Sequence, residues 1–194
     1  MEYIFPERGS ALETGRAAIT LILGGARSGK SRYAQALAGR ATDVVYLATA
    51  EASDDEMRVK IERHRRERPA TWTTVEVPLD LDDAIAHYGK KSSFLLIDCL
   101  TIFISNAMMA ENGNEPAIFR RVERVCAALD STPASVAAVS NEVGSSVVPA
   151  YPSGRQFRDL VGELNQRIAR ISRNVVLMVA GCPLALKGSV EAQL

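Results

Sequence analysis

Apolar residues along this 194-residue chain gather in short runs that are separated by segments with helical spacing. Runs rich in β-branched and apolar residues predict β-strands at 18–23, 44–49, 71–77, 93–98, 135–140 and 175–179. Apolar residues three and four positions apart predict helices at 32–40, 53–66, 79–88, 100–110, 117–129 and 157–173. The Gly and Pro within 180–183 are expected to end the last strand.

The alternation of strands and helices predicts an α/β fold. Several strands are apolar on both faces, which is typical of a mostly parallel sheet covered by helices on both sides. Neither a repeat nor a linker divides the chain, so residues 17–194 are expected to form one domain. Residues 1–16 lack clear periodicity, and we interpret them as an N-terminal extension without an assigned role.

The composition is that of an ordinary globular protein, with 47% hydrophobic and 24% charged residues. The formal net charge is zero, so no general electrostatic attraction to nucleic acid or to an anionic membrane is indicated. No apolar run approaches the ~20 residues that span a bilayer, and no signal peptide is indicated. Cys99, Cys126 and Cys182 lack metal-ligand spacing and are interpreted mainly as core thiols, which fits a reducing cytoplasm.

A phosphate-binding motif follows the first predicted strand. The pattern G-x-x-x-x-G-K-[ST] is formed by Gly24, Gly25, Ala26, Arg27, Ser28, Gly29, Lys30 and Ser31. Glycines allow successive N–H groups to point inward, and the following helix presents its positive dipole end to an anion. Lys30 would reach the β- and γ-phosphates, and the Ser31 hydroxyl would ligate Mg²⁺. The alternative is a flexible Gly/Ser turn that contains a lysine by chance.

Asp98 stands at the carboxyl end of the strand at 93–98. In a nucleotide-binding parallel sheet this edge faces the ligand crevice, so Asp98 can hold Mg²⁺ opposite Ser31 as a Walker-B acid does. The alternative is that Asp98 only caps the helix that starts near Leu100.

The end of the helix at 53–66 is strongly basic, because residues 63–66 read Arg-His-Arg-Arg and Arg68 lies just beyond. A neutral imidazole can attack phosphorus, and the neighbouring guanidinium groups would keep His64 unprotonated and bind phosphate oxygens. Composition and spacing also fit a solvated basic helix face, and they leave both interpretations open.

Three further strand ends are weaker candidates. Residues 48–50 end the second strand, where backbone groups could line a nucleotide. Glu76 could accept hydrogen bonds from a base or ribose, or could simply be exposed. Residues 141–144 read Asn-Glu-Val-Gly, which suits a second substrate and equally suits a turn.

These segments together resemble the bifunctional adenosylcobinamide kinase and adenosylcobinamide-phosphate guanylyltransferase family of cobalamin biosynthesis. The similarity runs from about residue 20 to residue 187. It is carried by residues 24–31, 46–50, 54–57, 61–65, 68–72, 141–144, 157–159 and 165–166. Some family members have a second histidine beside the nucleophile, where this chain has Arg63.

The resemblance implies two reactions. Adenosylcobinamide takes the γ-phosphoryl group of ATP or GTP, and GMP from GTP then passes through a covalent GMP-histidine, here His64, to adenosylcobinamide phosphate. It also implies a recombinase-like phosphate-loop fold, a homotrimer, and Mg²⁺ as cofactor. Nucleotide contacts are implied at residues 24–31 and at Ala48, Thr49, Ala50, Arg65, Arg66, Glu67, Arg68, Glu76 and Asp98. A simple small-molecule kinase without a covalent intermediate and a non-catalytic nucleotide-binding module are the competing hypotheses.

Overall fold

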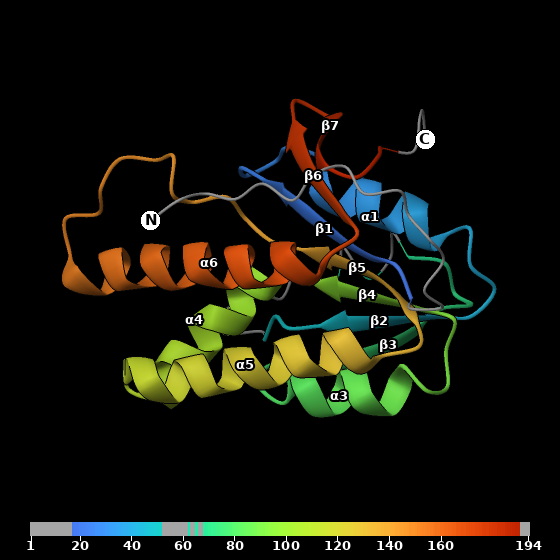
Figure 1. Ribbon diagram of the computed structural model, residues 1–194, viewed down its shortest axis with the longest axis horizontal. Coiled ribbons are helices and arrows are strands. Elements are labelled where there is room, and N and C mark those ends of the chain that lie inside the picture. Colours follow the sequence, from blue (N-terminus) through green and yellow to red (C-terminus); the bar gives the residue numbers. More distant parts are fainter. Residues whose placement is uncertain (1–16, 52–61, 63–64, 66–67, 191–194) are drawn as a thin grey trace.

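A computed structural model of the chain describes residues 17–51, 62, 65 and 68–190 (Figure 1). Its centre is a seven-stranded sheet with the strand order β3-β2-β4-β5-β1-β6-β7. The strands are β1 (Ile19–Gly24), β2 (Val44–Ala48), β3 (Thr73–Glu76), β4 (Phe94–Asp98), β5 (Ser135–Val139), β6 (Asn174–Val179) and β7 (Cys182–Lys187). All neighbouring strands are parallel except β6 and β7. The predicted mostly parallel α/β sheet is therefore confirmed.

Helices cover both faces of the sheet (Figure 1). They are α1 (Lys30–Ala38), α3 (Leu81–Tyr88), α4 (Leu100–Ala110), α5 (Glu115–Ser131) and α6 (Pro152–Ile171). One buried cluster packs α3 to α6 against one face, and a second packs α1 against the other. Alternate residues of β1 point to opposite faces, so Leu21 and Leu23 join the first cluster and Ile22 joins the second.

The strand predicted at 175–179 does end at Val179, but the prediction that it is the last strand was wrong. Ala180 and Gly181 have φ angles of 51° and 83°, which is the backbone of a tight two-residue hairpin turn. The chain therefore folds back, and β7 pairs antiparallel with β6. Every residue of β7 is exposed, so this strand has no buried face and no apolar periodicity that would predict it.

Helices α1, α5 and α6 start earlier than expected, and α5 begins at Glu115 rather than at residue 117. Helix α6 begins at Pro152 rather than at residue 157, because proline is well suited to the first turn of a helix, where its missing N–H is not needed. Helix α1 begins directly at Lys30. Of the expected core thiols, Cys99 and Cys126 are half-buried and Cys182 is exposed on β7. No described helix is both long and apolar enough to cross a membrane.

Candidate nucleotide site

The carboxyl ends of the parallel strands form one row at a single edge of the sheet. Glu76 is paired with Ala48, and Ala48 is paired with Asp98 on its other side. The row continues through Val139 to Ile22, two residues before the phosphate-binding motif. The structure thus brings together candidate residues from β1, β2, β3 and β4 at the edge where parallel sheets bind nucleotides.

The loop between β1 and α1 has a backbone that few residues can adopt. Gly24, Arg27 and Gly29 all have positive φ angles. A Cβ atom at Gly24 would lie 2.5 Å from the carbonyl oxygen of Met178, so only glycine fits there without a shift of the backbone. The glycine spacing in the motif therefore has a steric cause in this fold.

The β6–β7 turn supports this loop from the side. The backbone N–H of Gly181 donates a 3.0 Å hydrogen bond to the carbonyl oxygen of Ser28. A Cβ atom at Gly29 would approach the Cα atom of Gly181 to 3.3 Å. Sequence reasoning missed this contact, because the Ala-Gly pair at 180–181 lacks the Asn, Asp or Gly that usually occupies the first position of a two-residue hairpin turn.

The loop and the start of α1 are prepared for an anion. The first turn of α1 contains no acidic residue, so its positive dipole end is not neutralised. Lys30 is buried, and its ammonium group donates a 2.6 Å hydrogen bond to the carbonyl oxygen of Gly25. Burial lowers the pKa of Lys30, and the charge of Asp98 partly opposes that shift. The buried Ser28 hydroxyl has no partner among the described residues, as expected of a group that binds a phosphate oxygen.

Asp98 does not cap the helix that follows it. The N-cap residue of α4 is Cys99, and no side chain caps that helix end. The Oδ2 atom of Asp98 instead accepts a 2.8 Å hydrogen bond from the hydroxyl group of Tyr46. Burial and the neighbouring Asp98 charge raise the pKa of Tyr46, so the phenol stays protonated and acts as the donor.

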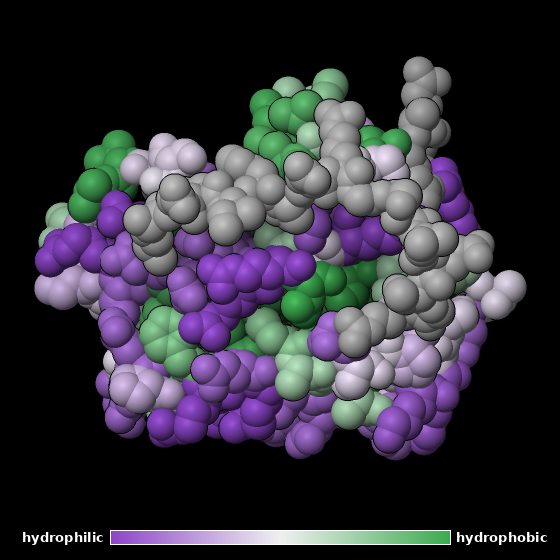
Figure 2. Space-filling view, in the orientation of Figure 1, coloured by the Kyte–Doolittle hydropathy of each residue, from purple (hydrophilic) through white to green (hydrophobic). Residues whose placement is uncertain are grey.

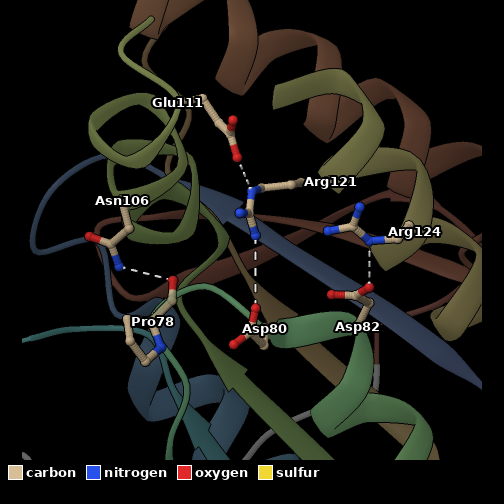
Figure 3. A network of polar contacts seen from close by, with 7 residues as sticks. All are labelled: Pro78, Asp80, Asp82, Asn106, Glu111, Arg121 and Arg124. Carbon is tan, nitrogen blue, oxygen red and sulfur yellow. Dashed lines mark hydrogen bonds and ion pairs between the residues drawn. The ribbon is translucent and has the colours of Figure 1, made fainter. Parts of the chain in front are cut away.

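Residues 48–50 hold the strand ends together. The Thr49 hydroxyl donates to the carbonyl oxygen of Cys99 at 2.7 Å and accepts from the Cys99 N–H at 2.8 Å. The side-chain amide of Asn106 donates to the carbonyl oxygens of Thr49 and Pro78, the second of which is drawn in Figure 3. Ala48 and Thr49 are buried and Ala50 is partly exposed, so Ala50 is the most accessible of the three predicted contacts.

Arg68 lies over the ring of Tyr46, the tyrosine that donates to Asp98. Its guanidinium carbon sits 3.5 Å from the centre of the Tyr46 ring, and its Nη1 atom donates to the Thr74 hydroxyl. Its buried Nε–H has no hydrogen-bond partner among the described residues. The structure therefore places Arg68 next to the pair formed by Tyr46 and Asp98, where sequence reasoning expected a nucleotide contact.

The other predicted contacts of the basic segment are placed only in part. Arg65 is exposed and helical, and its carbonyl oxygen accepts a hydrogen bond from the Arg68 N–H. His64, Arg66 and Glu67 lie outside the described residues. Glu76 is exposed at the end of β3.

A comparison with known proteins identifies the family of this chain. The profile of the family described as "Cobinamide kinase / cobinamide phosphate guanyltransferase" matches residues 20–186. The chain belongs to this family. Membership makes it a bifunctional enzyme, a kinase and nucleotidyltransferase, as the resemblance in the sequence implied.

Named relatives cover nearly the same residues. The chain is 38% identical over 178 residues to the bifunctional adenosylcobalamin biosynthesis protein CobU of Escherichia coli (strain K12), covering 86% of this chain and 98% of that protein. It is 41% identical over 169 residues to the bifunctional adenosylcobalamin biosynthesis protein CobP of Pseudomonas aeruginosa, covering 87% and 96% of the two chains. The chain therefore matches these two relatives along almost their whole length.

Solved structures with low identity show the fold. The RadB recombinase superposes with a TM-score of 0.50 at 15% identity, covering 82% of this chain and 73% of that one. An ATPase of a bacterial type III secretion system superposes with a TM-score of 0.54 at 13% identity, covering 87% and 56%. The expected recombinase-like phosphate-loop fold is confirmed.

Proposed function

We propose that this enzyme first phosphorylates adenosylcobinamide and then attaches GMP to the product. In the first reaction the substrate hydroxyl attacks the γ-phosphorus of ATP or GTP, the bond to the bridging oxygen breaks, and the hydroxyl proton leaves. In the second, a nitrogen of His64 displaces pyrophosphate from the α-phosphorus of GTP. A phosphate oxygen of adenosylcobinamide phosphate then displaces His64, and adenosylcobinamide-GDP is formed.

The observation that carries this proposal is the shared edge of the sheet. Asp98 lies close enough to Lys30 of the phosphate loop for its charge to act on that lysine, and Arg68 stacks on Tyr46, which is hydrogen-bonded to Asp98. The N–H of Arg68 also donates to the carbonyl oxygen of Arg65, at the end of the basic segment. A single triphosphate in this loop could thus present its γ-phosphorus to one acceptor and its α-phosphorus to His64. A covalent intermediate divides a transfer between two bulky substrates into two simpler steps.

Each described residue has a role in this proposal. Lys30 and the loop N–H groups balance the charge that develops on phosphate oxygens in the transition state. Ser31 and Asp98 would hold Mg²⁺, which supplies further charge neutralisation between the phosphates. The described residues contain no group of three His, Cys, Asp or Glu side chains that could hold a metal, so phosphate oxygens and water would complete the shell.

The arginines would serve the guanylyl transfer. Arg65, Arg66 and Arg68 would bind oxygens of the α-phosphate and of pyrophosphate. Their positive charge would also lower the pKa of His64 and keep its imidazole neutral and nucleophilic at neutral pH. Glu67, Glu76 and residues 48–50 remain proposed nucleotide contacts.

The covalent step can be tested by incubating the protein with Mg²⁺ and GTP labelled at the α-phosphorus. We expect protein-bound label that is labile in acid and stable in base, as a phosphoramidate is. His64→Ala should abolish the label. His87→Ala is the matched control, since the chain has two histidines and His87 lies exposed on α3. Undiminished labelling of His64→Ala would reject the covalent role and favour a simple kinase.

We also propose that the protein is a homotrimer and acts in the cytoplasm. Exposed apolar residues gather on two projections of the molecule, and Figure 2 shows apolar colour at both. Val179, Leu184 and Leu186 lie on the β6–β7 hairpin, and Val147 and Val148 lie on the loop after β5. Such patches suit subunit contacts. Light scattering during size-exclusion chromatography tests this, and a monomeric mass would contradict it.

A further inference from the structure

Tyr46 contacts both Asp98 and Arg68. It lies in β2, next to β4 in the sheet, and only 2% of its surface is exposed. Its hydroxyl donates to Oδ2 of Asp98. The guanidinium carbon of Arg68 lies 3.5 Å from the centre of the Tyr46 ring. The metal-binding candidate and the arginine nearest the basic segment are therefore supported by one buried side chain.

We infer that Tyr46 is a positioning residue that fixes Asp98 for the metal-bound nucleotide and fixes Arg68 for the guanylyl transfer. This rests on the roles proposed above for Asp98 and Arg68. With Oδ2 occupied by the phenol, the Oδ1 atom of Asp98 accepts no hydrogen bond among the described residues and is left for the Mg²⁺ shell.

The two contacts are chemically separable. The hydrogen bond requires the Tyr46 hydroxyl, whereas the contact with Arg68 requires only the aromatic ring, because a guanidinium group stacks on the face of any such ring. Tyr46→Phe therefore removes the hydrogen bond to Asp98 and the influence of the hydroxyl on Arg68, and it keeps the ring contact with Arg68. Tyr46→Leu removes both contacts.

The first test is binding of GDP with Mg²⁺ and with EDTA. GDP cannot transfer GMP with release of pyrophosphate, so binding is read without turnover. Trp72, the only tryptophan, packs against the same buried cluster as Tyr46 and serves as the fluorescent reporter. We expect Tyr46→Phe to reduce the Mg²⁺-dependent gain in affinity about ten- to hundredfold, the size expected for one hydrogen bond to a charged group, and to leave affinity in EDTA unchanged.

Tyr33→Phe is the matched control, because Tyr33 is a buried tyrosine of the same cluster and lies on α1. It should bind like the parent protein under both conditions. A Tyr46→Phe protein with the full Mg²⁺-dependent gain would overturn the inference if Asp98→Asn loses that gain. If Asp98→Asn also keeps it, the proposed role of Asp98 falls as well, so the two failures are distinguishable.

The second test is the rate at which GTP labels the protein covalently. We expect saturating Mg²⁺ to restore the labelling rate of Tyr46→Phe to that of the parent protein. Tyr46→Leu should label about tenfold or more slowly than the parent at any Mg²⁺ concentration. Arg68→Lys should show the same slow rate, and combining it with Tyr46→Leu should add little, because both remove one contact. Additive losses, or a Tyr46→Phe protein as slow as Tyr46→Leu, would overturn the link between the ring and Arg68.

Discussion

The ammonium group of Lys30 donates a 2.6 Å hydrogen bond to the carbonyl oxygen of Gly25. Gly25 lies near the beginning of the phosphate loop and Lys30 near its end. Lys30 is also buried, and that burial lowers its pKa. The lysine is therefore held inside its own loop at a cost in desolvation. Phosphate oxygens would be a better partner for this ammonium group than one carbonyl oxygen, as the proposed role of Lys30 requires.

Lys30→Ala should leave the stability of the fold nearly unchanged but impair the use of nucleotide. We expect the melting temperature of the free protein to stay within a few degrees of the parent's, since a partly desolvated charge is removed with its one carbonyl contact. Kinase and guanylyltransferase rates should both fall about 10²-fold or more, because both use the same phosphate site. Lys91→Ala, at an exposed position in the turn after α3, is the control. A full kinase rate in Lys30→Ala would contradict the shared site.

Gly24 and Gly25 provide a matched pair for the loop backbone. An alanine at Gly24 would meet the carbonyl oxygen of Met178 and the Ser28 hydroxyl at 2.5 and 2.6 Å, whereas an alanine at Gly25 meets nothing within 4 Å. We expect Gly24→Ala to lower the free energy of unfolding by about 1–3 kcal/mol and Gly25→Ala to leave it nearly unchanged. Urea unfolding measures both, and equal stabilities would show that the loop is not confined as described.

Two arginines of α5 reach carboxylates on neighbouring elements (Figure 3). Arg121 is mostly buried and bonds Glu111 at 2.7 Å, with Asp80 at 3.9 Å, while Arg124 is half-exposed and bonds Asp82 at 2.7 Å. Because solvent weakens exposed pairs, Arg121→Ala should cost about 1–2 kcal/mol of unfolding free energy and Arg124→Ala about 0.5 kcal/mol. Urea unfolding at low and high salt checks the order of the two effects, and the reverse order would contradict it.

The three thiols should differ in reactivity. Cys182 is exposed, whereas burial, aided by the charge of Asp98, raises the pKa of Cys99 to about 11. Burial also raises the pKa of Cys126. Since the thiolate is the attacking form, iodoacetamide at pH 8 should modify Cys182 first. Modification of Cys99 in the folded protein should accelerate only as the pH approaches 11.

Mass spectrometry of the peptides follows each cysteine separately, and Cys182→Ser should leave a nearly unreactive folded protein at pH 8. Rapid alkylation of Cys99 at that pH would show that its surroundings are more open than described. Unfolding in urea supplies the reference, because all three thiols should then react at similar rates.

Local features of the sequence were enough for the six parallel strands and the phosphate loop. The apolar runs placed β1, β2 and β4 within a residue or two of their observed bounds, because a strand buried on both faces must be apolar throughout. The glycine spacing likewise located the loop, and the carboxylate at the end of a strand singled out Asp98, whose role stays a prediction. His64 also came from the sequence, and its role stays a prediction.

The sequence by itself determined which segments form elements and which residue types can do the chemistry, since periodicity and turn chemistry act over a few neighbouring residues. Only the tertiary structure decided that Tyr46 meets Asp98, 52 residues away, and that Gly181 supports Ser28. It also decided that β7 exists at all, because a strand exposed on both faces is defined by pairing alone. Strand order and pairing arise from packing between distant segments, and no pattern within one segment records its future neighbour.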